Sequence, residues 1–386
     1  MRYKIDDIAT LIMDYRGKTP KKLGMDWTEN SHDILAISAK NIKNGRLINK
    51  DKAHYGDENL YKKWMKDGDI KVGDILMTSE APLGESYLIT KPLKAILSQR
   101  TFLIRLNKEL ADPWFFYSLI QSPMFKMKLL AKATGTTVIG IKQKELRKII
   151  VDLPSLNIQK KIGYYFKVID QKIRLNNQIN DNLVELINLI YLKFCADFPA
   201  KEKVSLDDVF NTSTKTFNVN ENKNINIWHF SIPNFDCNKQ PQCESTNSIK
   251  SNKKKVNSFG VLVSKLNPNF KRIWAPNLDF YSNYSPIASP EFIQINGNSQ
   301  EEQALIFCIL NSEEYTDFLV SNATGSTNSR QRVKPKIAVS YIIPFDLDKK
   351  KGLESLVSPI LKDIQQREFE NTKLQIIKDT VLNKYF

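Results

Sequence analysis

The sequence predicts an α/β (α+β) fold in which two mixed α/β domains are separated by an antiparallel coiled coil of two long helices. The first observation is an internal repeat at an offset of 190 residues: segments 121–125, 133–137 (Ala-Thr-Gly-Thr-Thr) and 153–154 (Leu-Pro) return as 311–315, 323–327 (Ala-Thr-Gly-Ser-Thr) and 343–344 (Ile-Pro). The second observation is a long stretch with helical periodicity after each of these prolines. Repeats in the same order indicate a duplicated unit and a pseudo-twofold molecule.

The two domains are expected at 1–153 and 199–343, and they open on the similar segments 3–8 and 203–209. Short apolar runs interrupted by Gly, Pro and Asn are typical of β-strands, and they follow the same order in both domains. In the first they lie at 33–38, 73–78 and 101–106; in the second they lie at 227–232, 260–264 and 291–295. A helical segment follows in each, at 113–130 and 300–320. Each domain should therefore hold a small, strongly bent sheet with helices.

The long helices are expected within 154–198 and 344–386, where apolar residues alternate at spacings of three and four. The predicted seam residues are Ile162, Ile169, Ile173, Leu183 and Ile190 in the first helix and Ile360, Ile364, Leu374 and Val381 in the second; the same stripes include Ile158, Tyr165, Leu186, Ile377 and Tyr385. We expect the two seams to bury each other, although each helix could instead pack on its own domain. Asn176, Asn177 and Asn371 either fix the register as a buried polar layer or face solvent.

Composition points to a polyanionic partner, because 57 Lys and Arg stand against 42 Asp and Glu and give a net charge of +15. No apolar run approaches the roughly 20 residues that span a bilayer, and the N-terminus lacks a signal-peptide core, so we expect a cytoplasmic protein without a membrane partner. Four scattered cysteines and three histidines predict neither a disulfide framework nor a metal site. Double-stranded DNA is the favoured polyanion, since two similar basic domains at a fixed separation suit grooves that recur about every 34 Å.

Polar side chains on the loops after the repeated strands are candidates for reading bases, because Arg pairs with guanine and Asn or Gln with adenine. The candidates in the first domain are Lys40, Asn41, Thr78, Ser79, Glu80, Gln99, Arg100, Lys142 and Gln143. Those in the second are Trp228, His229, Ser264, Lys265, Asn267, Asn269, Arg272, Ser329, Arg330 and Gln331. The loops after the two Ala-Thr-Gly segments differ, which favours different sequences read by the two copies. Gly135 and Gly325 are expected to occupy turns with positive φ.

Clusters of basic residues on other loops are candidates for phosphate contacts that release counterions. They are Arg16, Lys18, Lys21, Lys22, Lys250, Lys253, Lys254, Lys255, Arg332 and Lys334. Catalytic motifs are absent from the sequence: it has no Asn-Pro-Pro-aromatic or Asp-Pro-Pro-aromatic motif, no Gly-x-Gly-x-x-Gly loop and no Gly-x-x-x-x-Gly-Lys-Ser/Thr loop. We therefore predict no catalytic residue, no metal ligand and no bound cofactor in this chain.

The repeated Ala-Thr-Gly and Leu-Pro or Ile-Pro steps, with segments 73–84, 228–233 and 263–268, resemble the specificity subunits of type I restriction-modification systems. The resemblance implies two target-recognition domains, each reading one half of a split, asymmetric DNA site, and a coiled coil that sets the gap. It also implies docking of two modification subunits, which carry S-adenosylmethionine and methylate adenine, and of restriction subunits that use ATP and magnesium. The second helix lacks a tail found in some members, so closure between Phe386 and Met1 is expected to rest on few contacts.

Two other functions compete with this interpretation. A self-contained DNA methyltransferase or nuclease with a cryptic site would bind S-adenosylmethionine or a metal without a partner. An RNA-binding or coiled-coil adaptor would expose stacking aromatic residues on a sheet, whereas most Phe and Tyr here fall in core-like alternation.

Overall fold

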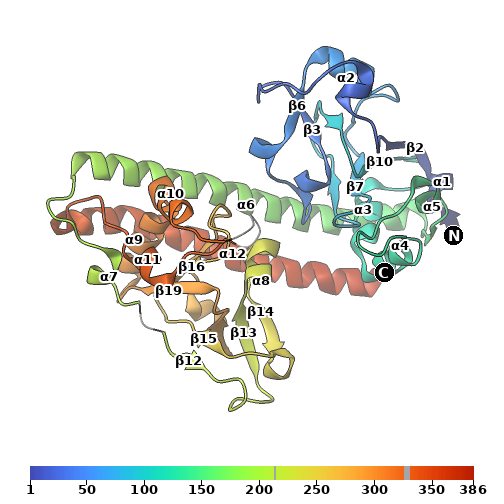
Figure 1. Ribbon diagram of the computed structural model, residues 1–386. Helices are drawn as coiled ribbons and strands as arrows, with labels where there is room; N and C mark the ends of the chain where they lie inside the picture. Colours follow the sequence, from blue (N-terminus) through green and yellow to red (C-terminus); the bar gives the residue numbers. More distant parts are fainter. Residues whose placement is uncertain (213, 326–330) are drawn as a thin grey trace. The chain divides into compact units, whose positions relative to one another are not determined.

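The computed structural model describes residues 1–212, 214–325 and 331–386 and divides the chain into two compact units (Figure 1). Unit 1 holds Met1–Arg174 and Leu374–Phe386, and unit 2 holds Leu175–Lys373. The prediction gave the helices regions of their own, at 154–198 and 344–386. In the structure each unit instead contains part of both long helices, because the helices supply side chains to the core of each unit.

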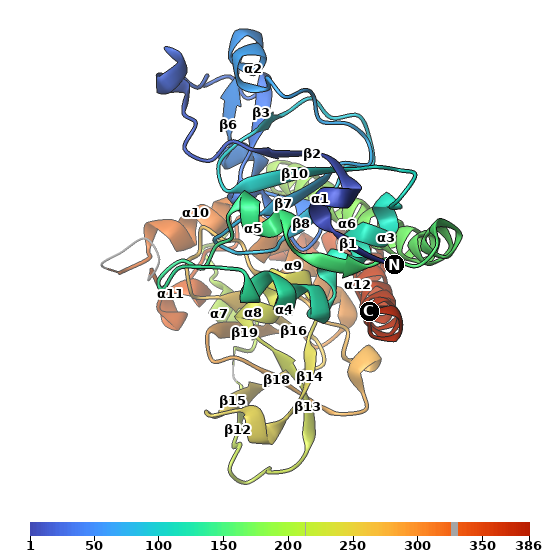
Figure 2. The ribbon, with the colours of Figure 1, turned by 90° about the vertical axis from the view of Figure 1, so that its right-hand side faces the viewer.

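The central sheet of unit 1 has the antiparallel order β2-β10-β7-β8, and Figure 2 shows these strands side by side. Their bounds are Ala9–Asp14 for β2, Thr101–Leu106 for β10, Ile75–Thr78 for β7 and Ser86–Leu88 for β8. The other strands are β1 (Arg2–Lys4) paired with β11 (Ile150–Asp152), the sheet β6 (His54–Gly56), β3 (Ile34–Ile37) and β9 (Ile96–Leu97), and the pair β4 (Ile42–Lys43) and β5 (Arg46–Leu47). The α-helices are α1 (Ile5–Ile8), α2 (Glu58–Trp64), α3 (Pro113–Gln121), α4 (Pro123–Ala131) and α5 (Gln143–Arg147).

Unit 2 is built around the antiparallel sheet β17-β16-β19 and a second sheet in the order β12-β15-β18-β13-β14. The first sheet comprises β16 (Gly260–Ser264), β17 (Ile273–Trp274) and β19 (Phe292–Asn296). The second comprises β12 (Thr216–Phe217), β13 (Asn226–Phe230), β14 (Gln242–Ser245), β15 (Lys253–Lys255) and β18 (Ser285–Ala288). The α-helices are α7 (Leu206–Val209), α8 (Ile232–Asn238), α9 (Gln300–Asn311), α10 (Glu313–Ser321) and α11 (Pro335–Val339).

The sequence repeat is a repeat of structure. In each unit one strand pairs in parallel with a later strand, β3 with β9 and β13 with β18, and an antiparallel pair follows, β7 with β10 and β16 with β19. The repeated serine in segments 121–125 and 311–315 is a helix N-cap in both units. Ser122 Oγ accepts a hydrogen bond from Phe125 N at 3.2 Å, and Ser312 Oγ accepts one from Tyr315 N at 3.1 Å. The duplicated sequence therefore marks the same helix start twice.

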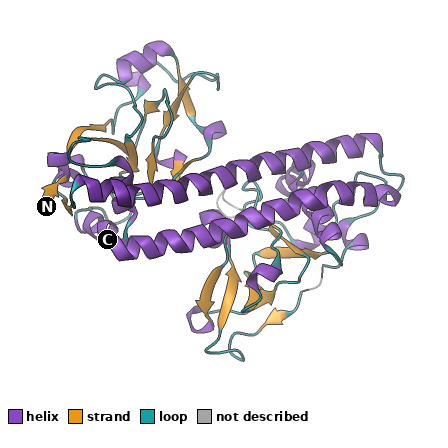
Figure 3. Cartoon of the chain, turned by 180° about the vertical axis from the view of Figure 1, so that it is seen from behind, coloured by secondary structure: helices purple, strands orange, loops and turns teal. Residues whose placement is uncertain are grey.

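The two long helices, α6 (Leu156–Asp197) and α12 (Lys350–Tyr385), pack side by side in antiparallel directions within each unit (Figure 3). In unit 1 Lys378 Nζ lies 3.5 Å from Asp170 Oδ1, and in unit 2 Asn180 Nδ2 donates to Ile364 O at 3.3 Å. The residue number of the α12 partner falls as the residue number in α6 rises, as in an antiparallel pair. No helix among the residues described has an apolar stretch long enough to cross a membrane.

The buried seam differs in detail from the predicted one. Ile162 and Ile364 are buried, whereas the other seven predicted residues are half-buried. The seam is also filled by Val357 and by large side chains that were not predicted: Phe166, Ile187, Tyr191, Leu353, Leu361 and Leu382. Five residues placed in the stripes are exposed instead: Ile158, Tyr165, Leu186, Ile377 and Tyr385. The buried face includes the polar residues Asp170, Asn176 and Asn180. A stripe predicted from apolar residues alone is therefore rotated around the helix axis relative to the buried face.

A polar layer crosses the seam within unit 2. Asn176 Nδ2 donates to Asn371 Oδ1 at 2.9 Å and to Glu370 Oε2 at 2.8 Å, and Asn371 Nδ2 donates to Asn177 Oδ1 at 3.1 Å. Asn176 and Asn371 are both buried. Because buried amides lose free energy unless they are paired, these bonds favour one register of the two helices.

Both Met1 and Phe386 pack on other residues of unit 1. The Phe386 ring lies 5.1 Å from the Phe115 ring and 6.1 Å from the Phe166 ring, measured between centroids. The Met1 ammonium group donates to Leu153 O at 2.7 Å. A sequence search misses these contacts because the aromatic partners are distant in the chain.

Candidate nucleic-acid interface

Each unit carries the same cluster of loops at one end of its antiparallel strand pair. Loop cluster 1 comprises residues 79–84, 98–100 and 134–143; loop cluster 2 comprises 265–272, 289–291, 323–325 and 331–334. In cluster 1 Ser79 N donates to Arg100 O at 2.9 Å, and Ile141 N donates to Ser79 O at 2.9 Å. In cluster 2 Lys265 N donates to Glu291 O at 3.0 Å, and Val333 N donates to Lys265 O at 2.9 Å. The same backbone ladder therefore joins three loops in both units.

The repeated Ala-Thr-Gly segment opens a closed loop in each cluster. Thr134 and Gly140 exchange two backbone hydrogen bonds at 2.8 and 2.9 Å, and Thr324 and Arg332 exchange two at 2.9 Å. Gly135 has φ +114°, and an added Cβ would lie 2.1 Å from Val138 O. The expected positive-φ turn is confirmed at Gly135, where only glycine fits. The candidates Ser329 and Arg330 lie outside the described residues.

Each cluster contains an ion pair between an arginine and a glutamate, but the two residues lie on different loops in the two clusters. In cluster 1 Arg100 Nε lies 2.9 Å from Glu80 Oε1; in cluster 2 an Arg332 terminal nitrogen lies 3.2 Å from Glu291 Oε1. The shared ladder aligns Glu291 with Arg100, so one backbone position carries opposite charges in the two units. The arginine side chains are 50% and 58% exposed. Each guanidinium therefore keeps donors that can reach a base edge or a phosphate.

Backbone conformation in the clusters is also unusual. Arg100 has φ +63° and Asn267 has φ +48°, both in the left-handed region that costs non-glycine residues free energy. Residues held in such conformations concentrate at binding sites, where the surrounding structure fixes them. The strain thus falls on the loops that carry the candidate side chains.

Four predicted base-reading residues are buried and serve the scaffold instead: Asn41, Thr78, Ser79 and Ser264. Asn41 Oδ1 accepts from Ser38 N and Oγ, and its Nδ2 donates to two backbone carbonyls. Thr78 Oγ1 donates to Pro82 O, and Ser264 Oγ donates to Leu266 O. The burial of these four side chains argues against contacts with base edges.

Four further candidates have partners within the protein. Arg272 is paired through two nitrogens with the Asp236 carboxylate, at 2.6 and 2.9 Å, and its side chain is 10% exposed. Gln143 Nε2 donates to Ile12 O at 2.7 Å. The Trp228 ring packs 5.3 Å from the Tyr281 ring. His229 Nδ1 faces Glu244 Oε1 at 3.3 Å, and burial lowers the pKa of His229. These contacts make Arg272, Gln143, Trp228 and His229 structural residues.

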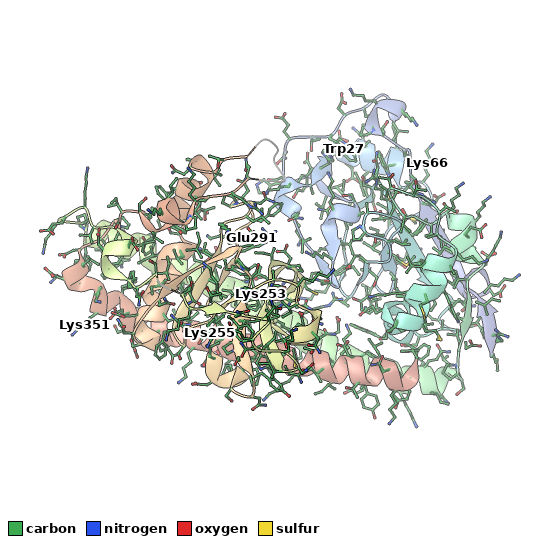
Figure 4. All side chains as sticks on the ribbon, turned by 60° about the horizontal axis from the view of Figure 1, so that its bottom comes forward. Trp27, Lys66, Lys253, Lys255, Glu291 and Lys351 are labelled. Atoms are coloured by element: carbon green, nitrogen blue, oxygen red, sulfur yellow. The ribbon has the colours of Figure 1, made fainter. Side chains whose placement is uncertain are left out.

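Three of the predicted phosphate contacts are likewise used internally. Arg16 pairs with Asp14 and donates to Ile141 O at 2.8 Å. Lys18 Nζ donates to Trp64 O at 2.6 Å, and burial lowers the pKa of Lys18. Lys253 is buried, and its Nζ donates to Ser251 O and Oγ at 2.8 Å. Figure 4 labels Lys253 and Lys255, and Lys255 is exposed. Only the exposed lysine of this pair suits a phosphate contact.

The other candidates keep surface accessible for a partner and stay predictions. They are Lys40, Gln99, Arg100, Lys142, Lys265, Asn267, Asn269 and Gln331 for bases, and Lys21, Lys22, Lys250, Lys254, Lys255, Arg332 and Lys334 for phosphates. Glu80 changes role, because it holds Arg100. Glu291 was missed, because the offset of 190 aligns Arg100 with Pro290 and only the backbone ladder aligns it with Glu291. No group of three or more His, Cys, Asp or Glu in the described ranges could hold a metal.

Comparison with known proteins agrees with this geometry. Residues 1–185 match the model of the type I restriction modification DNA specificity domain. Over this part the chain is similar to that domain family. The type I restriction enzyme HindI specificity subunit of Haemophilus influenzae is 27% identical over 139 residues, which cover 35% of this chain and 30% of that relative. The predicted resemblance to type I specificity subunits is confirmed.

One solved structure supports the predicted fold. The S subunit of a type I restriction-modification system from M. genitalium superposes with a TM-score of 0.52 at 15% identity, covering 100% of this chain and 96% of that chain. The HsdS subunit from Thermoanaerobacter tengcongensis gives a TM-score of 0.35 at 14% identity, covering 100% and 95%. The first of these confirms the predicted fold class, with two mixed α/β domains and two long helices.

Proposed function

We propose that the chain is the DNA-specificity subunit of a type I restriction-modification complex, without catalytic activity or a cofactor of its own. The observation that carries this proposal is the pair of loop clusters, which share one backbone ladder but present different side chains. Each cluster would read one half of a bipartite, asymmetric site in double-stranded DNA. Arg100 and Gln99 would read bases in one half, and Gln331 and Asn269 in the other.

The helices α6 and α12 would set the spacer between the half-sites and dock two modification subunits. Their polar layer and their antiparallel contacts support a fixed register. Large apolar side chains are exposed on these helices and offer a protein-binding surface: Leu175, Leu186, Leu189, Leu192, Leu356 and Ile376. S-adenosylmethionine would belong to the modification subunits, and ATP and magnesium to restriction subunits that join the complex.

The decisive test maps adenine methylation by long-read sequencing in cells that carry this chain with its modification subunit, and in cells without this chain. A split asymmetric motif that disappears on deletion is the expected result. An unchanged methylome would refute the proposal. Exchanging segment 1–153 for that of another specificity subunit should change one half of the motif only, and a change in both halves would contradict separate reading.

Lengthening both helices should change the spacer without changing either half-site. Seven residues inserted after Arg174 in α6 and seven after Lys373 in α12, where the chain passes from one unit to the other, add about two turns to each helix, or about 10 Å, while nearly preserving the facing sides. The expected methylation motif keeps both halves and gains base pairs between them. Insertion in α6 alone is the control and should abolish methylation, because the seam no longer matches. An unchanged spacer in the double insertion would remove the helices from this role.

A further inference from the structure

A groove of about 470 Å³ opens on unit 1 beside α3 and the first turns of α6. Its apolar lining comes from Val72, Leu88, Ile89, Pro113 and Trp114. Its charged lining comes from Lys108, Lys160 and Lys167, with Asp112 as the acidic residue. A groove with an aromatic ring and three cations is suited to an anionic ligand that also has an apolar part.

The groove lies at the end of the central sheet opposite loop cluster 1. Val72 precedes β7, Ile89 follows β8 and Lys108 follows β10, and in an antiparallel sheet these positions share one end. Loops 79–84 and 98–100 occupy the other end. At about 3.3 Å per residue, the strands put roughly 13 Å between the two ends. The groove is therefore separate from the loops proposed to read DNA.

Helix α6 forms one wall of the groove with residues on a single face. Lys160, Tyr164, Lys167 and Gln171 follow the spacing of one helical stripe. Tyr164 is 61% exposed and extends the apolar surface along α6. Gly163 permits this arrangement, because an added Cβ would lie 2.4 Å from Asp112 Oδ1 at the start of α3.

The three lysines carry uncompensated charge. No described residue forms an ion pair with Lys108, Lys160 or Lys167, which are exposed or half-buried. The Asp112 carboxylate is occupied as the N-cap of α3, where Oδ1 accepts from Phe115 N at 2.9 Å. An incoming carboxylate would therefore meet three cations in a partly desolvated groove.

The duplicated unit shows which chemistry complements these cations. In unit 2 helix α9 has two glutamates in its first turn, and Glu302 Oε1 lies 3.1 Å from Lys350 Nζ at the start of α12. The repeat offset aligns Lys350 with Lys160. Helix α3 has no acidic residue in its first turn, where Trp114 stands instead. Unit 2 thus pairs Lys350 with a carboxylate of its own chain, whereas at the same offset unit 1 has Asp112, whose Oδ1 caps α3.

We propose that this groove binds an acidic segment of a partner protein. Carboxylates of that segment pair with Lys108, Lys160 and Lys167, and a large apolar side chain packs against Trp114. Duplex DNA fits less well, because its phosphates would leave the apolar lining uncovered and the groove faces away from loop cluster 1.

A photo-crosslinking peptide tests the proposal on the full chain. The probe is a fluorescent 12-residue peptide of Asp, Glu and Leu with one central benzoylphenylalanine, and its binding is followed by fluorescence anisotropy at 150 mM salt. The triple variant Lys108→Glu, Lys160→Glu, Lys167→Glu should bind at least tenfold more weakly. The matched control Lys4→Glu, Lys126→Glu, Lys161→Glu carries the same charge change on exposed sites of unit 1 and should change binding less than twofold. Crosslinks should map to 72–73, 88–90, 108–114 or 160–171.

Three outcomes would overturn the proposal. Equal weakening in both triple variants would mean general attraction to a basic protein, and crosslinks outside the lining would place the peptide elsewhere. Displacement of the peptide by a short DNA duplex, with duplex binding lost in the groove variant alone, would make the groove a DNA site. If the triple variant fails to fold, as judged by circular dichroism, the single variant Tyr164→Glu replaces it, with the same tenfold loss and crosslink criterion.

Discussion

Replacing Asp74 with alanine is expected to lower the free energy of unfolding by about 3–5 kcal/mol, because it strands a half-buried guanidinium. The Asp74 carboxylate is buried and accepts hydrogen bonds from Arg105 Nε at 2.8 Å and Arg105 Nη2 at 2.7 Å. It also accepts one from Lys71 N at 2.7 Å. The hydrogen bonds with Asp74 raise the pKa of Arg105, which keeps the guanidinium charged.

Urea denaturation followed by tryptophan fluorescence measures this effect. The control is Asp152→Ala, which removes an ion pair with Arg2 whose side chains are 58% and 78% exposed. Such a surface pair contributes about 0–1 kcal/mol. The double variant Asp74→Leu, Arg105→Met should recover most of the loss, because no charge stays unpaired. Similar losses of unfolding free energy for Asp74→Ala and Asp152→Ala would show that the buried ion pair stabilises the fold no more than the exposed one.

Replacing Arg100 with alanine is expected to relax the preference for one base pair in one half of the methylated motif, by roughly 1–3 kcal/mol of discrimination. Gln331→Ala should do the same in the other half, since Arg100 and Gln331 belong to different loop clusters. The measurement is the methylation frequency of every single-base variant of the motif, read by long-read sequencing. The proposed function underlies this expectation.

Lys21→Ala provides the contrast, because an exposed lysine on a phosphate should weaken binding alike for all sequences. Glu80→Gln should resemble a milder form of Arg100→Ala, since the amide still reaches Arg100 but without charge. Relaxation in both halves after Arg100→Ala, or a uniform loss like that of Lys21→Ala, would assign Arg100 to the DNA backbone or to the scaffold.

The fold could be predicted from the sequence to a large extent, because its strongest signals are local or repeated. The Ala-Thr-Gly segments, the serine N-caps and the helical periodicity each recur at one offset, and the structure places them in equivalent elements. The seam was less accurate. Asn176 and Asn180 lie on the buried face, and a pattern search that scores only apolar residues steps around them.

The candidate site was predicted less well, because pairing across the chain decides which side chains reach solvent. Arg272 looks available in the sequence, but Asp236 binds it from α8, 36 residues earlier. Lys18 looks like a surface cation, but Trp64 O holds it across 46 residues. No local pattern signals such partners. The groove on unit 1 is equally hidden, since its lining extends from Val72 to Gln171.

The asparagine layer makes the allowed lengths of the helix pair discrete. A slip of one turn between α6 and α12, about 5.4 Å, would separate Asn176 from Asn371 and break the hydrogen bond between their amides. Each buried amide left unpaired costs about 1–3 kcal/mol, so intermediate offsets are depopulated by one to two orders of magnitude or more. During evolution the two helices can then change length only by whole turns added to both of them. Insertions or deletions of single residues in one helix are selected against.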